Sequence, residues 1–191
     1  MAKTLDTIAT KGAKEFYQGS IAKQIVADLQ ANDGMLSLKD FKDHHADWVK
    51  PIHVNYRDNV AYNFPPNTQG MAYLEILNVL NNYDLRSLGE GTADFYHTII
   101  EATKQAFADR DKYLTDPDFS PIPLDYLLSA EHGKAQADRI DLKKAATKVE
   151  PLDPKGDTIW LGVVDKDGNA VSLIQSIYHD FGSGIVPKEL V

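Results

Sequence analysis

Thr158 is the residue whose type and position bear most directly on chemistry. It follows Gly156 and Asp157 and opens an apolar segment typical of a β-strand. A threonine at this position is ordinary in a structural role. It can also act as a nucleophile whose base is its own α-amine, provided that the chain is cut between Asp157 and Thr158, because an amide nitrogen is no base. The sequence therefore leaves a structural and a catalytic role open for Thr158.

The segment that Thr158 opens predicts a β-hairpin. Residues 158–164 and 169–174 are largely apolar, and Asp167-Gly168 between them is a turn dipeptide. An antiparallel hairpin with a four-residue turn brings its two ends together, so Ser176 is expected near Thr158. The Ser176 hydroxyl could then hydrogen-bond that of Thr158, although a structural serine explains the same spacing.

Two groups of residues contain side chains that could bind a metal but lack the spacing that a metal site requires. Asp165, Asp167 and Asn169 resemble the start of a calcium loop, but its sixth and twelfth positions would be Ala170 and Ser176 rather than Gly and Glu. A hairpin turn explains the same residues. No HxxxH or HxH spacing connects the histidines, which are His44, His45, His53, His97, His132 and His179. We therefore expect no metal and no cofactor.

Helical periodicity dominates the part of the chain that must position the hairpin. We divide the sequence into a mostly helical portion, 1–150, a linker, 151–157, and a β-rich end, 158–191. The polar stretch that contains Pro151 and Pro154 is typical of an exposed linker. Helices are expected over residues 5–9, 21–29, 71–80, 92–114 and 124–140, with another starting at Ser37, and a hairpin is expected over residues 52–62.

The composition excludes several classes of protein. The 191 residues are 43% hydrophobic, which fits one globular domain or a large piece of one. A net charge of -8 gives no electrostatic footprint for nucleic acid, and no polybasic run suggests an anionic membrane surface. Cysteine is absent, so disulfides and thiolate chemistry are excluded. No apolar run approaches the roughly 18 residues of a membrane span, and the segment after Met1 does not resemble a signal peptide. We therefore expect a soluble chain, and the sequence does not identify its cellular compartment.

Four segments, in order along nearly the whole chain, resemble the γ-glutamyltranspeptidase family. They cover residues 16–22, 65–80, 97–119 and 156–184, and the last two are the most specific. The third segment carries the densest set of matching residues, which are His97, Glu101-Ala102, Lys104, Ala106-Phe107-Ala108-Asp109-Arg110, Tyr113-Leu114 and Asp116-Pro117-Asp118-Phe119.

The resemblance implies a fold and a reaction. Members of this family are made as inactive precursors with an αββα N-terminal nucleophile (Ntn) hydrolase fold, so an α+β fragment of that fold is expected. They cut themselves before a threonine, which then attacks a γ-glutamyl amide such as glutathione; water or an amine acceptor resolves the acyl-enzyme. The matching nucleophile is Thr158, with Asp157 on the departing side. Ser176 matches a second threonine that hydrogen-bonds the nucleophile.

Tyr178 departs from the family pattern. Members that bind the α-amino and α-carboxylate groups of a γ-glutamyl substrate commonly have asparagine at this position, and a phenol cannot reproduce the paired donor and acceptor of an amide. Residues 172–178 are more similar to the γ-glutamyltransferase-like and acylase-like branch. We therefore expect amide hydrolysis at Thr158, with a weak substrate-binding assignment for Tyr178 and with either γ-glutamyl or another acyl group as substrate.

The resemblance also implies that the chain is a fragment spanning the end of the large subunit and the start of the small one. The family's carboxylate-binding arginine would lie upstream of Met1, and its oxyanion-hole glycines would lie downstream of Val191. One oxyanion donor is typically worth about 10²–10³ in rate. We therefore expect the fragment to be unprocessed and inactive, with the remainder of its own polypeptide as partner. The alternative is a non-catalytic domain or degenerate homologue that serves as a folding or interaction unit.

Overall fold

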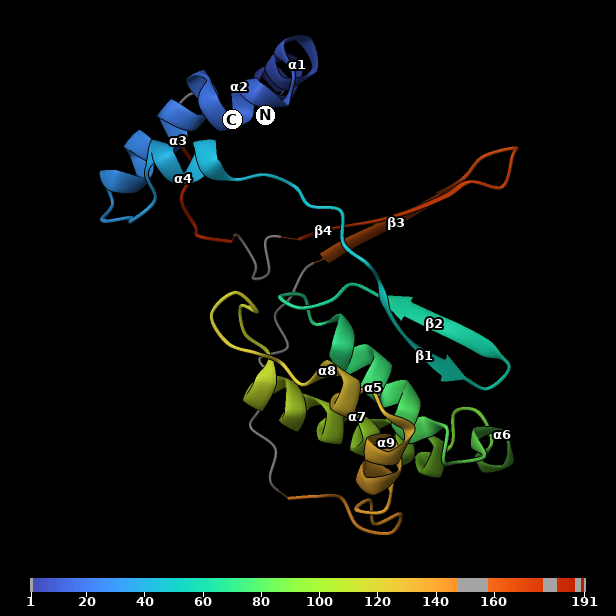
Figure 1. Ribbon diagram of the computed structural model, residues 1–191. Coiled ribbons are helices and arrows are strands. Elements are labelled where there is room, and N and C mark those ends of the chain that lie inside the picture. The colour runs from blue at the N-terminus through green and yellow to red at the C-terminus, as the bar shows by residue number, and fades with distance from the viewer. Residues whose placement is uncertain (1, 148–157, 177–181, 188–189, 191) are drawn as a thin grey trace. The chain divides into compact units, whose positions relative to one another are not determined.

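The computed structural model describes residues 2–147, 158–176, 182–187 and 190 (Figure 1). Nine helices and four strands lie in these ranges, with a hairpin at the C-terminal end, which confirms the predicted mixture of helix and strand. None of these helices combines the length and the apolar character needed to cross a membrane. The chain divides into two compact units, Met1–Ala46 with Leu152–Val191, and Asp47–Pro151.

The first unit begins with four short helices, of which α2 contacts the other three. The helix expected over residues 5–9 is longer than predicted, and Gly12, with φ of +78°, separates it from a helix that the sequence did not predict. Within the first of these helices, the Thr4 hydroxyl donates a hydrogen bond to the carbonyl of Leu190, near the other end of the chain, at 2.6 Å. The bounds are α1 Ala2–Lys11, α2 Ala13–Gln18, α3 Ser20–Gln30 and α4 Leu38–Asp43.

The helix predicted over residues 21–29 and the helix predicted to start at Ser37 are confirmed. Ile21, Ala22 and Val26 of α3 are buried. At the start of α4, the Ser37 amide and hydroxyl both donate to the Asp40 carboxylate at 2.7 Å. An acid three residues after the cap thus satisfies an amide that the helix itself leaves without a partner.

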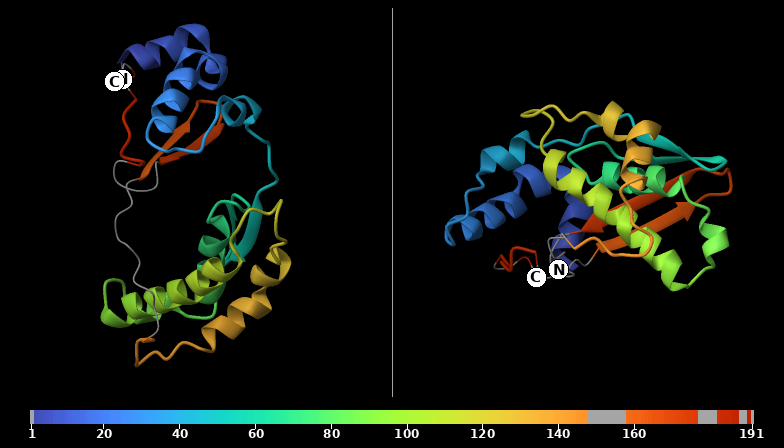
Figure 2. Two further views of the ribbon diagram at one scale, coloured as in Figure 1. Left: turned by 90° about the vertical axis from the view of Figure 1, so that its left-hand side faces the viewer. Right: turned by 90° about the horizontal axis from the view of Figure 1, so that it is seen from below.

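The second unit is built around α5. This helix contacts both strands of the first hairpin and also α7, α8 and α9 (Figure 2). Its residues Val79 and Leu80 pack with Ala102 and Ala137 in a buried apolar cluster. The bounds are β1 Ile52–Tyr56, β2 Asn59–Asn63, α5 Gly70–Leu80, α6 Leu85–Leu88, α7 Ala93–Tyr113, α8 Leu124–Leu127 and α9 Ala130–Ala137.

Side-chain caps set the N-terminal boundaries of α7 and α9. The Thr92 hydroxyl accepts from the Phe95 amide at 3.2 Å and starts α7, so the helix predicted over residues 92–114 is confirmed. The single helix predicted over residues 124–140 is wrong. The first helix ends at Leu127, and the Ser129 hydroxyl accepts from the His132 amide at 3.1 Å to start α9. A serine side chain competes with the helical backbone and favours such a restart.

Replacing Gly133 with alanine is expected to destabilise the protein. Alanine in a helix interior normally gains about 1 kcal/mol over glycine. A Cβ at Gly133, however, would lie 2.7 Å from the Asn78 Cβ and 3.0 Å from its backbone carbon. Asn78 cannot easily move, because its amide donates to the Leu128 carbonyl at 2.8 Å. Overpacking costs about 1–3 kcal/mol, which outweighs the gain from alanine, so we expect a net loss of up to about 2 kcal/mol in the free energy of unfolding measured with urea.

The matched control for this prediction is Lys134→Ala, at the next, exposed position of α9. It removes only an exposed ion pair with Asp138, which is worth a few tenths of a kcal/mol. A Gly133→Ala variant that unfolds at a higher urea concentration than the wild type would contradict this prediction. It would show that α5 and α9 can move apart at Gly133 without loss of stability.

Candidate functional site

The C-terminal hairpin brings Thr158 and Ser176 into register. Strand β3, Thr158–Val164, pairs antiparallel with β4, Ala170–Ser176. Thr158 is the direct partner of Ser176 at the open end of the ladder, and Val164 is the partner of Ala170 beside the turn. The predicted hairpin and the predicted proximity of its two ends are confirmed at the level of the backbone.

The turn of this hairpin is formed by the residues that resembled a calcium loop. The amides of Asp167 and Asn169 donate to one Asp165 carboxylate oxygen at 2.9 Å, and the Asn169 side chain donates to the other at 2.9 Å. Gly168 has φ of +83°, which favours glycine. The hydrogen bonds from the side chain and backbone of Asn169 lower the pKa of Asp165 below its usual value. The Asp165 carboxylate thus serves the turn, as predicted.

The other residues proposed for this site lie outside the described part of the chain. Asp157, on the departing side of the predicted cleavage, and Tyr178, the weak substrate-binding candidate, both fall there. The assignments of Asp157, Thr158, Ser176 and Tyr178 to catalysis, processing and substrate binding stay predictions.

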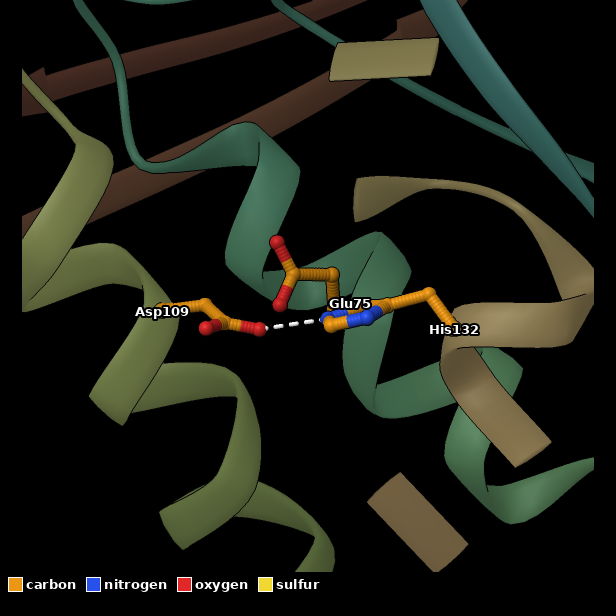
Figure 3. Close-up of side chains that lie close together, drawn as sticks. All are labelled: Glu75, Asp109 and His132. Atoms are coloured by element: carbon orange, nitrogen blue, oxygen red, sulfur yellow. Dashed lines mark hydrogen bonds and ion pairs between the residues drawn. The ribbon is translucent and has the colours of Figure 1, made fainter. Parts of the chain in front are cut away.

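A second group of polar side chains lies inside the other unit. Glu75 from α5, Asp109 from α7 and His132 from α9 point toward one another (Figure 3). The His132 Nε2 lies 2.6 Å from the Asp109 Oδ2, and the Gln136 amide donates to the same oxygen at 2.8 Å. The side chain of Glu75 is fully buried, and His132 and Gln136 are nearly so. Three helices thus place two carboxylates, an imidazole and an amide in one buried cluster.

The electrostatics of this cluster centre on Glu75. Burial, and then the charge of the Asp109 carboxylate, raise the pKa of Glu75 to about 8, against a smaller opposing effect of Gln136. A carboxyl group in such surroundings holds its proton at neutral pH, because an ionised form would be buried next to a second negative charge. Displaced pKa values of this kind often mark functional positions.

A family model described as gamma-glutamyltranspeptidase matches residues 1–190 of the chain. The chain belongs to the γ-glutamyltranspeptidase family. Its resemblance along the whole sequence, including the segment with Asp109 and the hairpin with Thr158, is therefore confirmed.

Individual relatives within the γ-glutamyltranspeptidase family agree with this assignment. The chain is 42% identical to the glutathione hydrolase-like YwrD proenzyme of Bacillus subtilis (strain 168), over 97% of this chain and 35% of that protein. It is 40% identical to the glutathione hydrolase proenzyme of Escherichia coli (strain K12), over 99% of this chain and 34% of that protein. The chain thus spans about a third of the length of these relatives.

The likeness extends to three dimensions. The structure matches the crystal structure of cephalosporin acylase from Bacillus halodurans with a TM-score of 0.83 at 38% identity, over 97% of this chain and 33% of that one. The predicted α+β class and the Ntn hydrolase fold of the γ-glutamyltranspeptidase family are confirmed.

Sequence reasoning missed the cluster of Glu75, Asp109 and His132. The three residues come from separate helices, so no short motif contains them. Glu75 stands between Leu74 and Ile76 in a strongly apolar helix, and a charged residue in such surroundings is a sign of burial that the sequence does offer. The sequence does not say which residues would face it.

Proposed function

We propose that the chain is the portion of a self-processing γ-glutamyltranspeptidase-like amidohydrolase that ends its large subunit and begins its small one. Thr158 is the nucleophile, and it becomes N-terminal when the bond after Asp157 is cut. Membership of the family supports the reaction class. Relatives named as proenzymes support a cleavage step in a longer polypeptide.

The observation that carries the proposal is the pairing of Thr158 with Ser176 in the ladder. Residues directly opposite each other in an antiparallel pair share one face of the sheet, with Cβ atoms about 4.5–5.5 Å apart. A serine hydroxyl at this separation can donate to or accept from the nucleophile. The register thus supports the role of Ser176 as the residue that orients Thr158.

The chemistry uses the two groups of one residue. After cleavage, the free α-amine of Thr158 takes the proton from its own hydroxyl, and the oxygen attacks the carbonyl carbon of the substrate amide. The carbon–nitrogen bond breaks, the amine leaves with a proton, and an ester to Thr158 remains. Water or a second amine then attacks that ester and restores the hydroxyl. Before cleavage the nitrogen of Thr158 is an amide and cannot be the base.

The acyl group is a γ-glutamyl or related group, and Tyr178 is the residue that we expect to affect this choice. An amide side chain offers a separate acceptor and donor, which can bind the α-amino and the α-carboxylate group of a γ-glutamyl substrate. A phenol has only one hydroxyl for both groups. Similarity to proteins named as a glutathione hydrolase and a cephalosporin acylase supports both classes of acyl group. An acylase acting on another amide is therefore the second candidate.

Two anilides that differ by one group test the substrate class. The full-length protein is incubated with a chromogenic γ-glutamyl anilide and with the glutaryl anilide, which lacks only the α-amino group. We expect hydrolysis of at least one, and a marked preference for the first assigns the γ-glutamyl class. A full-length protein that is uncut and hydrolyses neither contradicts the proposal and favours a non-catalytic folding or interaction unit.

The 191-residue chain by itself is inactive in this proposal. Every described residue from Ala170 to Ser176 is exposed, and Val164 and Ile174 remain 71% and 63% exposed. A two-stranded hairpin is marginally stable at best without further strands or a covering helix. The apolar surface of the hairpin supports packing against the remainder of its own polypeptide. Hydrolysis of either anilide by the isolated 191 residues would reject this part.

Replacing Ser176 with alanine is expected to slow the full-length enzyme without removing its nucleophile. A hydrogen bond to a charged or developing charged group is worth about 1.5–3 kcal/mol, which corresponds to a loss of roughly 10- to 100-fold in kcat. Ser176→Thr keeps the hydroxyl and is the matched control, expected to retain most of the rate. Equal rates for Ser176→Ala and the wild type would leave Ser176 with a structural role only.

A further inference from the structure

The buried cluster of Glu75, Asp109, His132 and Gln136 contains polar atoms without partners. Four buried side-chain atoms have no hydrogen-bond partner at ordinary distance and angle among the described residues, and all four belong to this cluster: both carboxylate oxygens of Glu75, the Nδ1 of His132 and the Oε1 of Gln136. Buried polar atoms in folded proteins are nearly always paired, so their concentration at one point calls for a ligand.

The unpartnered atoms have the chemistry of electron-pair donors. Carboxylate oxygens, an amide oxygen and an imidazole nitrogen are ligands for cations. One ligand atom from each of Glu75, Asp109 and His132 can be chosen so that all three lie within 4.8 Å of one another. A cation bound here would draw these atoms closer together, to bond lengths of about 2.0–2.2 Å.

The helices hold these donors in place. The Ser129 cap fixes the first turn of α9, which carries His132. The Gln136 amide and the His132 ring both contact Asp109, so α9 and α7 are joined on one side of Glu75. The Asp109 side chain keeps 18% of its surface exposed, which gives a small ion a route to the cluster.

We propose that Glu75, Asp109 and His132 bind a divalent transition-metal ion of the zinc class, which ties α5, α7 and α9 together. Binding of the ion displaces the proton that Glu75 otherwise holds at neutral pH, so that two carboxylates then balance the charge of the ion. The Oε1 of Gln136 is available as a further donor. One imidazole with carboxylate oxygens suits zinc and its neighbours. Calcium prefers six to eight oxygen ligands, which this cluster does not offer, so it is not expected to bind.

Metal titration of the full-length protein tests this proposal. Protein treated with a chelator and then freed of it is titrated with ZnCl₂ by calorimetry and with CoCl₂ by visible absorption. We expect one saturable site, a changed cobalt spectrum and a rise in the thermal midpoint with zinc, but no response to calcium. Glu75→Gln has nearly the same shape and one ligand fewer. Since loss of a mere supporting residue weakens metal binding about 10–100-fold, loss of a ligand is expected to weaken it by at least as much.

Two controls separate this site from surface binding. Glu131→Gln changes an exposed carboxylate on the same helix as His132 and is expected to leave zinc affinity unchanged. His44→Ala with His45→Ala removes two exposed neighbouring imidazoles, and it too is expected to leave the site intact. Asp109→Asn provides a second ligand variant should Glu75→Gln fail to fold by circular dichroism. The proposal is overturned if the wild type binds no zinc, if the folded cluster variants bind it equally well, or if binding disappears with His44 and His45.

Discussion

The full-length protein with Thr158→Ala is expected to remain one uncut chain with no measurable amidase activity. The Thr158 hydroxyl is proposed to attack the carbonyl of Asp157, so that an ester replaces the peptide bond and water then opens it. Alanine has no oxygen to make this attack. Loss of a catalytic nucleophile costs about 10⁴-fold or more in kcat, the largest effect expected for any single change in this chain. Intact-mass analysis detects the missing cleavage, and anilide hydrolysis detects the missing turnover.

Thr158→Ser is the matched control for this experiment. It keeps the hydroxyl and loses one methyl group, so we expect the two fragments to appear, at a lower rate than in the wild type. The wild-type protein should part before Thr158 under the same conditions. A wild-type protein that stays whole and is nevertheless active would contradict the proposed mechanism, because its Thr158 nitrogen would still be an amide.

A second large effect is expected from Glu75, in the pH dependence of stability measured with a chelator present. The pKa of Glu75 is raised from 4.5 to about 8 by burial and the Asp109 charge. Between these values the unfolded chain has lost a proton that the folded protein still holds, so the free energy of unfolding falls as pH rises. At about 1.4 kcal/mol per pH unit the fall has an upper limit near 5 kcal/mol. It levels off once pH passes about 8.

Glu75→Gln is expected to remove this slope. Glutamine has nearly the same shape and never ionises, so the variant should match the wild type near pH 5 and exceed it in stability near pH 8. The charged or polar groups that surround the position, Asp109 from α7 and His132 and Gln136 from α9, are present in both proteins. Urea unfolding across pH 5–9 measures the difference, with the exposed Glu131→Gln as control. A slope that persists in Glu75→Gln would assign it to another group.

The hairpin with Thr158 and Ser176 was predictable because its structure is local. The turn residues from Asp165 to Asn169 hydrogen-bond among themselves, and the turn sets the register of the two strands that follow from it. The helix from Thr92 was likewise predictable, since its cap and its periodicity lie within one stretch of sequence. Two short helices replace one predicted helix because of the Ser129 cap. Hydrophobic periodicity does not reveal which partner a single serine side chain will choose.

The sequence by itself determined the family, the hairpin register and the residue proposed as nucleophile, because each depends on neighbouring residues or on motifs in linear order. Only the tertiary structure decided that Glu75, Asp109 and His132 meet. Their proximity depends on how α7 and α9 pack on α5, where Gly133 permits a close approach to Asn78. Such packing is the sum of many contacts between distant parts of the chain. A polar residue's buried neighbours, and with them its pKa and its possible ligands, therefore exist only in the folded protein.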